Sequence, residues 1–119
     1  MPTIFILDDD DNTSFAMEFW LKRKGYSVKS FVNANQLLQQ VQATVPDVVL
    51  LDIHLNGEDG REVCQYLKNM ETFDTPVFLI STNTDYSNDF TKCKADGFMH
   101  KPYHMKELPD MIQSRITFD

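Results

Sequence analysis

The chain has 119 residues, 42% of them hydrophobic, and a formal net charge of −7. This length suits one domain with one core, and this hydrophobic content argues against disorder. Nucleic-acid phosphates are bound by Lys and Arg, so the negative charge argues against a nucleic-acid partner and fits a divalent cation or a basic partner surface better.

No apolar run reaches the roughly 18 residues that a membrane span requires, and no secretory leader is visible at the N-terminus. The two cysteines, Cys64 and Cys93, lie far apart in the sequence and have no metal-ligand spacing. We therefore expect two reduced thiols, a cytoplasmic location and no association with a membrane.

The first predicted strand, residues 3–7, is an apolar run that ends in four consecutive Asp residues, 8–11. A helix is predicted to follow and to end near Lys24, because Gly25 stops it. Its candidate N-cap residues are Asn12, Thr13 and Ser14. Its apolar face is predicted to consist of Phe15, Ala16, Phe19 and Trp20. We interpret Asp10 and Asp11 as solvated capping acids rather than as ligands.

Two strands and a helix are predicted next. Residues 26–31 alternate apolar and polar side chains, which is typical of an edge strand with one wet face. Asn33 opens a helix that carries Leu37, Leu38 and Val41. Residues 48–51 are four apolar residues that run directly into Asp52. Such an unbroken run predicts a strand buried on both faces, as in a parallel sheet.

The second half of the chain repeats the alternation. A third helix is predicted from the apolar positions Val63, Tyr66, Leu67 and Met70. A strand at residues 77–80 leads into Ser81, a weakly apolar helix follows at about 85–95, and a short strand at 97–100 leads into Lys101. The last helix begins near His104 and carries Leu108, Met111, Ile112 and Ile116.

Five strands alternating with five helices predict an α/β fold with a parallel sheet and helices on both faces. The flavodoxin-like doubly wound sheet, with strand order 2-1-3-4-5, places strands one and three side by side. Polar residues then meet at the carboxyl edge of the sheet. They are Asp8, Asp9, Asp52, Ser81 and Lys101.

Three carboxylates at one edge repel one another, so a cation is expected to share the site. Oxygen ligands select a hard ion, and Mg²⁺ suits a site with few carboxylates and a phosphate. Lys101 and Ser81 are positioned to bind phosphoryl oxygens, and an aspartyl phosphate is a known type of covalent intermediate. Because four Asp residues are consecutive, Asp9 and Asp10 could also be the pair of carboxylates at the cation site. Counting from the end of the strand favours Asp8 and Asp9.

These residues resemble the receiver domain of two-component response regulators, the chemotaxis-type fold. The similarity covers essentially the whole chain. The matching pieces are residues 5–9, 49–52, 59–60, 76–81 and 97–102. Each piece alone is weak, but four strand ends in the right order are specific.

The resemblance implies a role for each matching residue. Asp52 is the phosphoacceptor, and Asp8 and Asp9 form the acidic pair, with Asp9 favoured as the direct Mg²⁺ ligand. His54 gives its backbone carbonyl to the metal, and Lys101 binds the phosphoryl group. Three further roles are implied: a phosphoryl sensor at Ser81, an aromatic switch at Phe98 and a cis peptide bond before Pro102.

The resemblance also implies partners. A histidine kinase or histidine phosphotransfer protein donates the phosphoryl group, and the surface of the fourth helix, fifth strand and fifth helix changes in response. Such a domain is not a conventional enzyme, although it catalyses its own Mg²⁺-dependent phosphorylation and dephosphorylation. Residues 1–119 are expected to be one receiver domain without an output domain, acting on a separate protein or within a longer one.

Four positions depart from the common family pattern. Asn56 stands where many receivers have Pro, and Thr82 is larger than the usual small residue. Lys94 stands where a Gly often ends the fourth helix, and Phe98 has no hydroxyl group. None of these changes removes a catalytic group, so they affect the expected rates and switch amplitude rather than the chemistry.

Three alternative functions fit parts of this sequence. A pseudo-receiver would bind partners without phosphotransfer. A haloacid-dehalogenase-type phosphatase would use a nucleophile on the first strand, such as Asp8, but this chain is short for that fold and Asp52 would have no role. A flavodoxin-like cofactor domain is disfavoured, because the acidic loop after the first strand would repel the phosphate of FMN.

Overall fold

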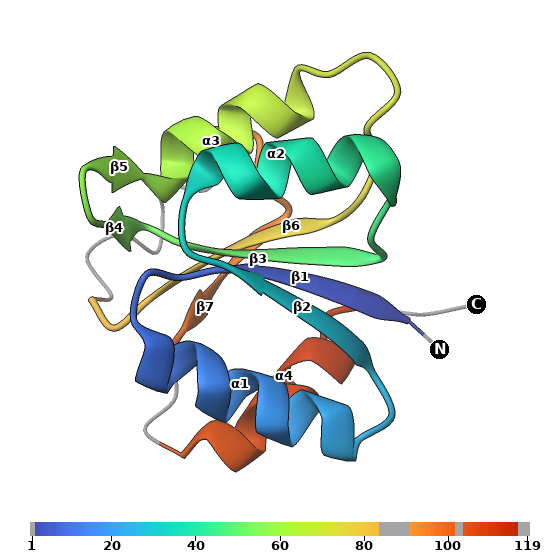
Figure 1. The fold of residues 1–119 in the computed structure, drawn as a ribbon, viewed down its shortest axis with the longest axis vertical. Helices are drawn as coiled ribbons and strands as arrows, with labels where there is room; N and C mark the ends of the chain where they lie inside the picture. Colours follow the sequence, from blue (N-terminus) through green and yellow to red (C-terminus); the bar gives the residue numbers. More distant parts are fainter. Residues whose placement is uncertain (1, 84–90, 102–103, 117–119) are drawn as a thin grey trace.

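The computed structural model describes residues 2–83, 91–101 and 104–116. Five parallel strands form its central sheet (Figure 1). They are β1 (Thr3–Leu7), β2 (Ser27–Phe31), β3 (Val48–Asp52), β6 (Val77–Ser81) and β7 (Gly97–His100). Their order across the sheet is β2-β1-β3-β6-β7, which confirms the predicted order 2-1-3-4-5 of a flavodoxin-like sheet.

Helices cover both faces of this sheet (Figure 1). The helical elements are α1 (Asp11–Arg23), α2 (Ala34–Ala43), α3 (Gly60–Lys68), the 3-10 turn η3 (Met105–Glu107) and α4 (Leu108–Gln113). α2 and α3 lie on one face, and α1 lies with α4 on the other. Within the described residues, no helix has the length and apolar character needed to cross a membrane.

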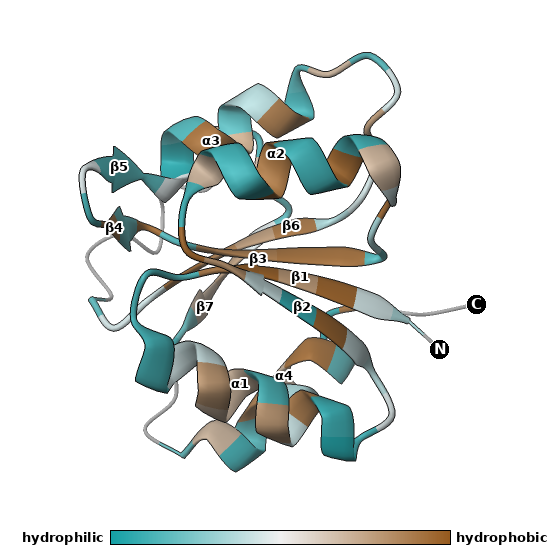
Figure 2. Ribbon diagram, viewed as in Figure 1, coloured by the Kyte–Doolittle hydropathy of each residue, from teal (hydrophilic) through white to brown (hydrophobic). Residues whose placement is uncertain are grey.

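The core has one apolar layer on each side of the sheet, and Figure 2 shows the apolar strands between the two helical layers. Every residue of β3 and of β6 is buried, as predicted for central strands of a parallel sheet. Alternate side chains of β3 enter opposite layers: Val49 and Leu51 pack toward α2 and α3, and Leu50 packs toward α1 and α4.

A short hairpin after β3 was not predicted. It consists of β4 (His54–Leu55) and β5 (Glu58–Asp59), which pair antiparallel around a turn in which Gly57 has φ of +78°. Glu58 Oε1 accepts a hydrogen bond from the backbone N of Ala34 at the start of α2 (3.0 Å). This contact ties the segment after Asp52 to the neighbouring helix.

For α1, the predicted capping role of Asp10 is confirmed, whereas the other candidate N-caps and the predicted apolar face were wrong. Its N-cap is Asp10, whose carboxylate accepts hydrogen bonds from the first backbone N–H groups of the helix. Its buried residues are Ser14, Met17 and Leu21, whereas Phe15 is 71% exposed. The Ser14 hydroxyl donates to the backbone carbonyl of Asp8 (3.3 Å), and this contact with the strand end turns the aromatic side of the helix outward.

Two other helical predictions need correction or lie outside the described residues. In α3, Cys64 is buried and Tyr66 is 59% exposed, so the predicted apolar face was wrong at Tyr66 and missed Cys64. The predicted fourth helix, at about 85–95, falls largely outside the described residues, and its described end at 91–94 forms turns. The described part of the chain therefore contains four α-helices and not the five predicted.

Candidate functional site

The carboxyl ends of the neighbouring strands β1 and β3 bring three acidic residues together. One carboxylate oxygen from each of Asp8, Asp9 and Asp52 lies within 4.8 Å of the others. Asp8 is 0% exposed and Asp52 is 7% exposed, while Asp9 is half-buried. The sequence predicted this set, and the structure assembles it at one edge of the sheet.

Lys101, which follows β7, connects the two buried carboxylates. Its Nζ lies 2.6 Å from Asp8 Oδ2 and 3.0 Å from Asp52 Oδ2. Its side chain is 11% exposed, so the ammonium group has little water to replace these partners. The cation partly neutralises a pair of acids that would otherwise repel each other in a buried setting.

The surroundings set the protonation preferences of this group of charges. Burial raises the pKa of the Asp52 carboxyl group above its usual value, and the nearby Lys101 ammonium opposes this effect without cancelling it. Burial alone would lower the pKa of Lys101, but its hydrogen bond to Asp8 and the charge of Asp52 outweigh burial and raise that pKa. Lys101 is therefore held as a cation at neutral pH.

Of the four consecutive Asp residues, Asp8 and Asp9 have a carboxylate oxygen within 4.8 Å of Asp52 in the three-residue cluster. Asp10 is exposed and caps α1, whereas Asp8 and Asp9 face Asp52. Asp9 Oδ2 accepts a hydrogen bond from the backbone N of Asn56, in the loop after β3. A proline at position 56, which is common in the receiver family, has no N–H and could not make this contact.

The backbone after β3 holds Asp52 in place. The backbone N of His54 donates to Asp52 Oδ1 (3.1 Å). Gly60, the first residue of α3, lies so close that a Cβ there would be 2.1 Å from the backbone oxygen of Asp52. Asp59 caps α3, and its pKa is lowered by its hydrogen bonds to Arg61. The sequence signal for this close approach is the Asp59-Gly60 pair.

Ser81 ends β6, and Phe98 lies within β7. Ser81 is 1% exposed, and its hydroxyl accepts a hydrogen bond from the backbone N of Asn83 (3.0 Å). Phe98 is 8% exposed and belongs to the core on the side of α2 and α3. Pro102, for which a cis peptide bond was predicted, lies outside the described residues.

Lys94 shows how a departure from the family pattern is accommodated. It has φ of +66°, in the left-handed region that favours glycine, and it is the only described non-glycine residue there. Its position is the one where a glycine was expected. Lys94 Nζ donates to Asn69 Oδ1 at the end of α3 (3.2 Å), which connects this strained residue to the neighbouring helix.

The donor set fits a hard divalent cation. It consists of one carboxylate oxygen atom from each of Asp8, Asp9 and Asp52, and Mg²⁺ prefers such oxygen atoms to nitrogen or sulfur. Among the residues that the structure describes, Lys101 is the one cation that forms ion pairs with these acidic residues. One cation for three carboxylates leaves residual negative charge, which a divalent ion can neutralise.

Comparison with solved structures gives the same fold. The response regulator TrrA of Thermotoga maritima, in complex with Mg²⁺ and BeF, is 24% identical with a TM-score of 0.85, and the match covers 98% of this chain and 100% of that chain. The chemotaxis response regulator CheY4 of Vibrio cholerae is 19% identical with a TM-score of 0.87, covering 98% and 99%.

A third match shows this fold as part of a longer protein. NtrX of Brucella abortus is 23% identical with a TM-score of 0.85, and the match covers 96% of this chain but 26% of that chain. A family model of the response regulator receiver domain matches residues 4–113. With its sheet order, its acidic edge and this match, the chain belongs to the response regulator receiver domain family.

Proposed function

We propose that this chain is a phosphorylation switch in a two-component system, with Asp52 as the phosphoacceptor. The observation that carries the proposal is the bridge from Lys101 Nζ to both Asp8 and Asp52, at 2.6 and 3.0 Å. An ammonium group that contacts both carboxylates supports a role for Lys101 in binding a phosphoryl group carried by Asp52. Residues 1–119 act as one receiver unit, in the cytoplasm.

In the proposed reaction, one oxygen of the Asp52 carboxylate attacks the phosphorus atom of a phosphohistidine. The new O–P bond forms while the bond from phosphorus to the ring nitrogen breaks, and the nitrogen keeps the electron pair. Lys101 then pairs with an oxygen of the transferred group, as it now pairs with Asp52. The donor is a histidine kinase or a histidine phosphotransfer protein.

Mg²⁺ is the cofactor of the proposal. Asp8, Asp9, Asp52 and the backbone carbonyl of His54 would hold it. The ion would screen the negative charge shared by the carboxylate and the phosphoryl group. Support comes from the oxygen-only cluster within 4.8 Å.

The response of the domain is proposed to begin at Ser81. Its hydroxyl can leave the backbone N of Asn83 and donate to a phosphoryl oxygen. Phe98 lies in the adjoining strand, paired in register with Leu79 two residues before Ser81, so its packing can change with that movement. The surface around β7, η3 and α4 then presents a different face to an output domain or target protein.

The test is mass spectrometry after incubation with acetyl phosphate, with and without Mg²⁺. We expect one added phosphoryl group on the wild type, and none with EDTA or in Asp52→Asn. Asp10→Asn is the matched control, because Asp10 caps α1 and lies outside the cluster, and it should accept phosphate as the wild type does.

Two results would contradict the proposal in different ways. An adduct that persists in Asp52→Asn and maps to Asp8 would support a phosphatase-like nucleophile on the first strand. No adduct in a folded wild type, with acetyl phosphate or a phosphorylated donor, would make the chain a pseudo-receiver that acts by binding alone.

A further inference from the structure

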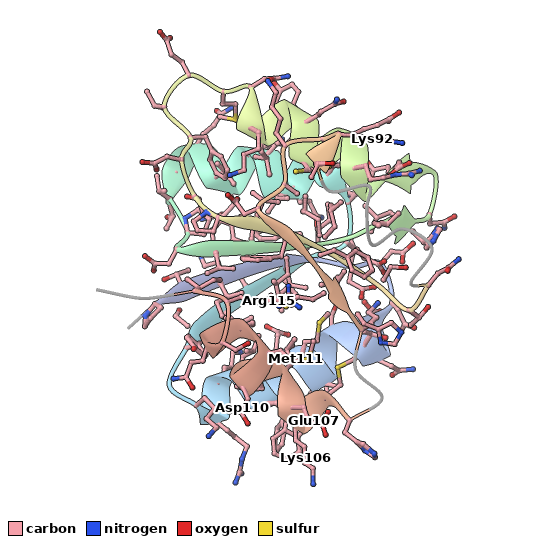
Figure 3. The ribbon with its side chains drawn as sticks, turned by 180° about the vertical axis from the view of Figure 1, so that it is seen from behind. Lys92, Lys106, Glu107, Asp110, Met111 and Arg115 are labelled. Carbon is pink, nitrogen blue, oxygen red and sulfur yellow. The ribbon has the colours of Figure 1, made fainter. Side chains whose placement is uncertain are left out.

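A groove of about 440 Å³ lies between the end of α1 and the η3–α4 segment, on the outer side of that helical layer. It is lined by Trp20, Arg23, Lys24, Lys106, Pro109 and Asp110. Figure 3 shows Lys106 and Asp110 at the outer edge of this layer, away from the sheet. Trp20 lies ten residues beyond the Asp10 cap, so the groove is roughly 15 Å along α1 from the acidic edge.

The charge of this groove is opposite to that of the chain as a whole. The chain has a net charge of −7, yet the lining contains three cations and one acid, Asp110. Arg23, Lys24 and Lys106 are all exposed. In the described part of the chain, none of these three cations lies within ion-pair distance of a carboxylate, whereas the neighbouring Lys22 is paired with Glu18 (3.6 Å).

Aromatic side chains fix the position of one of these cations. The guanidinium carbon of Arg23 lies 5.6 Å from the ring centroids of both Phe19 and Trp20. The two rings meet edge to face, with centroids 5.0 Å apart, and Phe19 is 44% exposed. An arginine held on aromatic faces loses less conformational freedom when it binds a carboxylate, and Trp and Arg are common at the centre of binding surfaces.

We propose that this groove binds an acidic peptide segment of a partner protein. Carboxylates of the segment pair with Arg23, Lys24 and Lys106, and one apolar side chain of the segment packs on Trp20 beside Pro109. Charge complementarity favours a short peptide over an extended polyanion. A membrane or a nucleic acid would also meet the surrounding surface of this acidic chain and be repelled, whereas a short peptide contacts the groove alone.

The protein contains a single tryptophan, so the fluorescence of Trp20 reports directly on the groove. The probe is a short acetylated peptide of alternating Glu and Leu, titrated into the full chain, with the same peptide carrying Gln for Glu as its control. We expect the Glu peptide to shift the Trp20 emission saturably. Its affinity should fall at least about tenfold when salt is raised to about 0.5 M.

The matched variants each remove three positive charges. Arg23→Gln, Lys24→Gln and Lys106→Gln together should weaken binding of the Glu peptide at least about tenfold, because each lost charge pair contributes to affinity. The control combines Lys29→Gln, Lys92→Gln and Arg115→Gln, three exposed cations outside the groove. It has the same net charge and should bind the Glu peptide with affinity within about twofold of the wild type. Circular dichroism checks that both triple variants are folded.

Several results would overturn the proposal. Equal weakening in the two triple variants would mean that net charge, and not the groove, attracts the peptide. Equal binding of the Glu and Gln peptides would remove the role of carboxylates. Binding to phosphatidylserine vesicles but not to the Glu peptide would point to a membrane, and a dimer seen by sedimentation and lost in the groove variant would make a second copy of this chain the occupant.

Discussion

The bridge at Lys101 makes a prediction that can be worked through from the structure. Lys101→Met keeps much of the apolar stem but removes the ammonium group. The three partners are buried, with side chains 11% (Lys101), 0% (Asp8) and 10% (Asp52) exposed. Removing one member of a buried ion pair typically costs about 3–5 kcal/mol, because a buried charge loses its partner.

Protonation limits this cost. Burial already raises the pKa of Asp52, and without Lys101 that pKa rises further, so Asp52 can take up a proton instead of remaining charged. A carboxyl group with a raised pKa stabilises the folded state less as pH rises through that pKa. We therefore expect Lys101→Met to lower the free energy of unfolding by about 3 kcal/mol near neutral pH and by clearly less near pH 5.

The assay is urea denaturation in EDTA, followed by circular dichroism at the two pH values. Lys92→Met, at an exposed position, is the control and should change stability by less than about 0.5 kcal/mol. Adding Asp52→Asn to Lys101→Met should recover much of the loss near neutral pH, because the uncompensated charge is gone. A loss that is equal at both pH values and unaffected by Asp52→Asn would refute the electrostatic reasoning and leave packing of the lysine stem as the cause.

Three further predictions concern stability. In EDTA near neutral pH, Asp52→Asn should unfold at a higher urea concentration than the wild type, because it removes a buried negative charge. Below the unperturbed carboxyl pKa of 3.8 the variant should show no gain in stability, because the wild-type carboxyl group is also neutral there. A gain in stability that is independent of pH would contradict this reasoning. Lys94→Gly should raise the free energy of unfolding by about 1 kcal/mol, because glycine relieves the left-handed backbone at φ of +66°, whereas Lys94→Ala should give no such gain in the same urea measurement. Gly60→Ala should lower the free energy of unfolding by at least about 3 kcal/mol, because its Cβ would lie 2.1 Å from the backbone oxygen of Asp52. Gly57→Ala, which has open space but φ of +78°, should lower it by only about 1 kcal/mol. Similar losses for the two variants would argue against the clash.

The strands of the central sheet and the polar residues that end them were predictable because their signals are local. An unbroken apolar run such as residues 48–51 can be buried on both faces only in the middle of a sheet, and the polar residue that ends it then lies at the sheet edge. The same argument applied to Asp8, Ser81 and Lys101. The resemblance to receiver domains added the expected roles, and the parallel strand order followed from the alternation of strands and helices.

Which face of each helix packs against the sheet was not predictable, because it depends on contacts with residues distant in sequence. α1 carries two possible apolar faces, and the aromatic one was the stronger sequence signal. The contact between the Ser14 hydroxyl and the Asp8 carbonyl, together with the packing of Met17 and Leu21, selects the other face. Trp20, which belongs to this aromatic side and was predicted to lie on the apolar face, then lines the basic groove.

The sequence by itself determined which strands form the central sheet and which residues end them, because burial patterns within a few residues specify central strands and their polar ends. Only the tertiary structure decided how those ends interact. Lys101 meets Asp8 and Asp52 across sequence separations of 93 and 49 residues, and the backbone N of Asn56 meets Asp9 across 47. Such contacts depend on strand register and on the path of the loop after β3, which only the packed sheet and its helices fix.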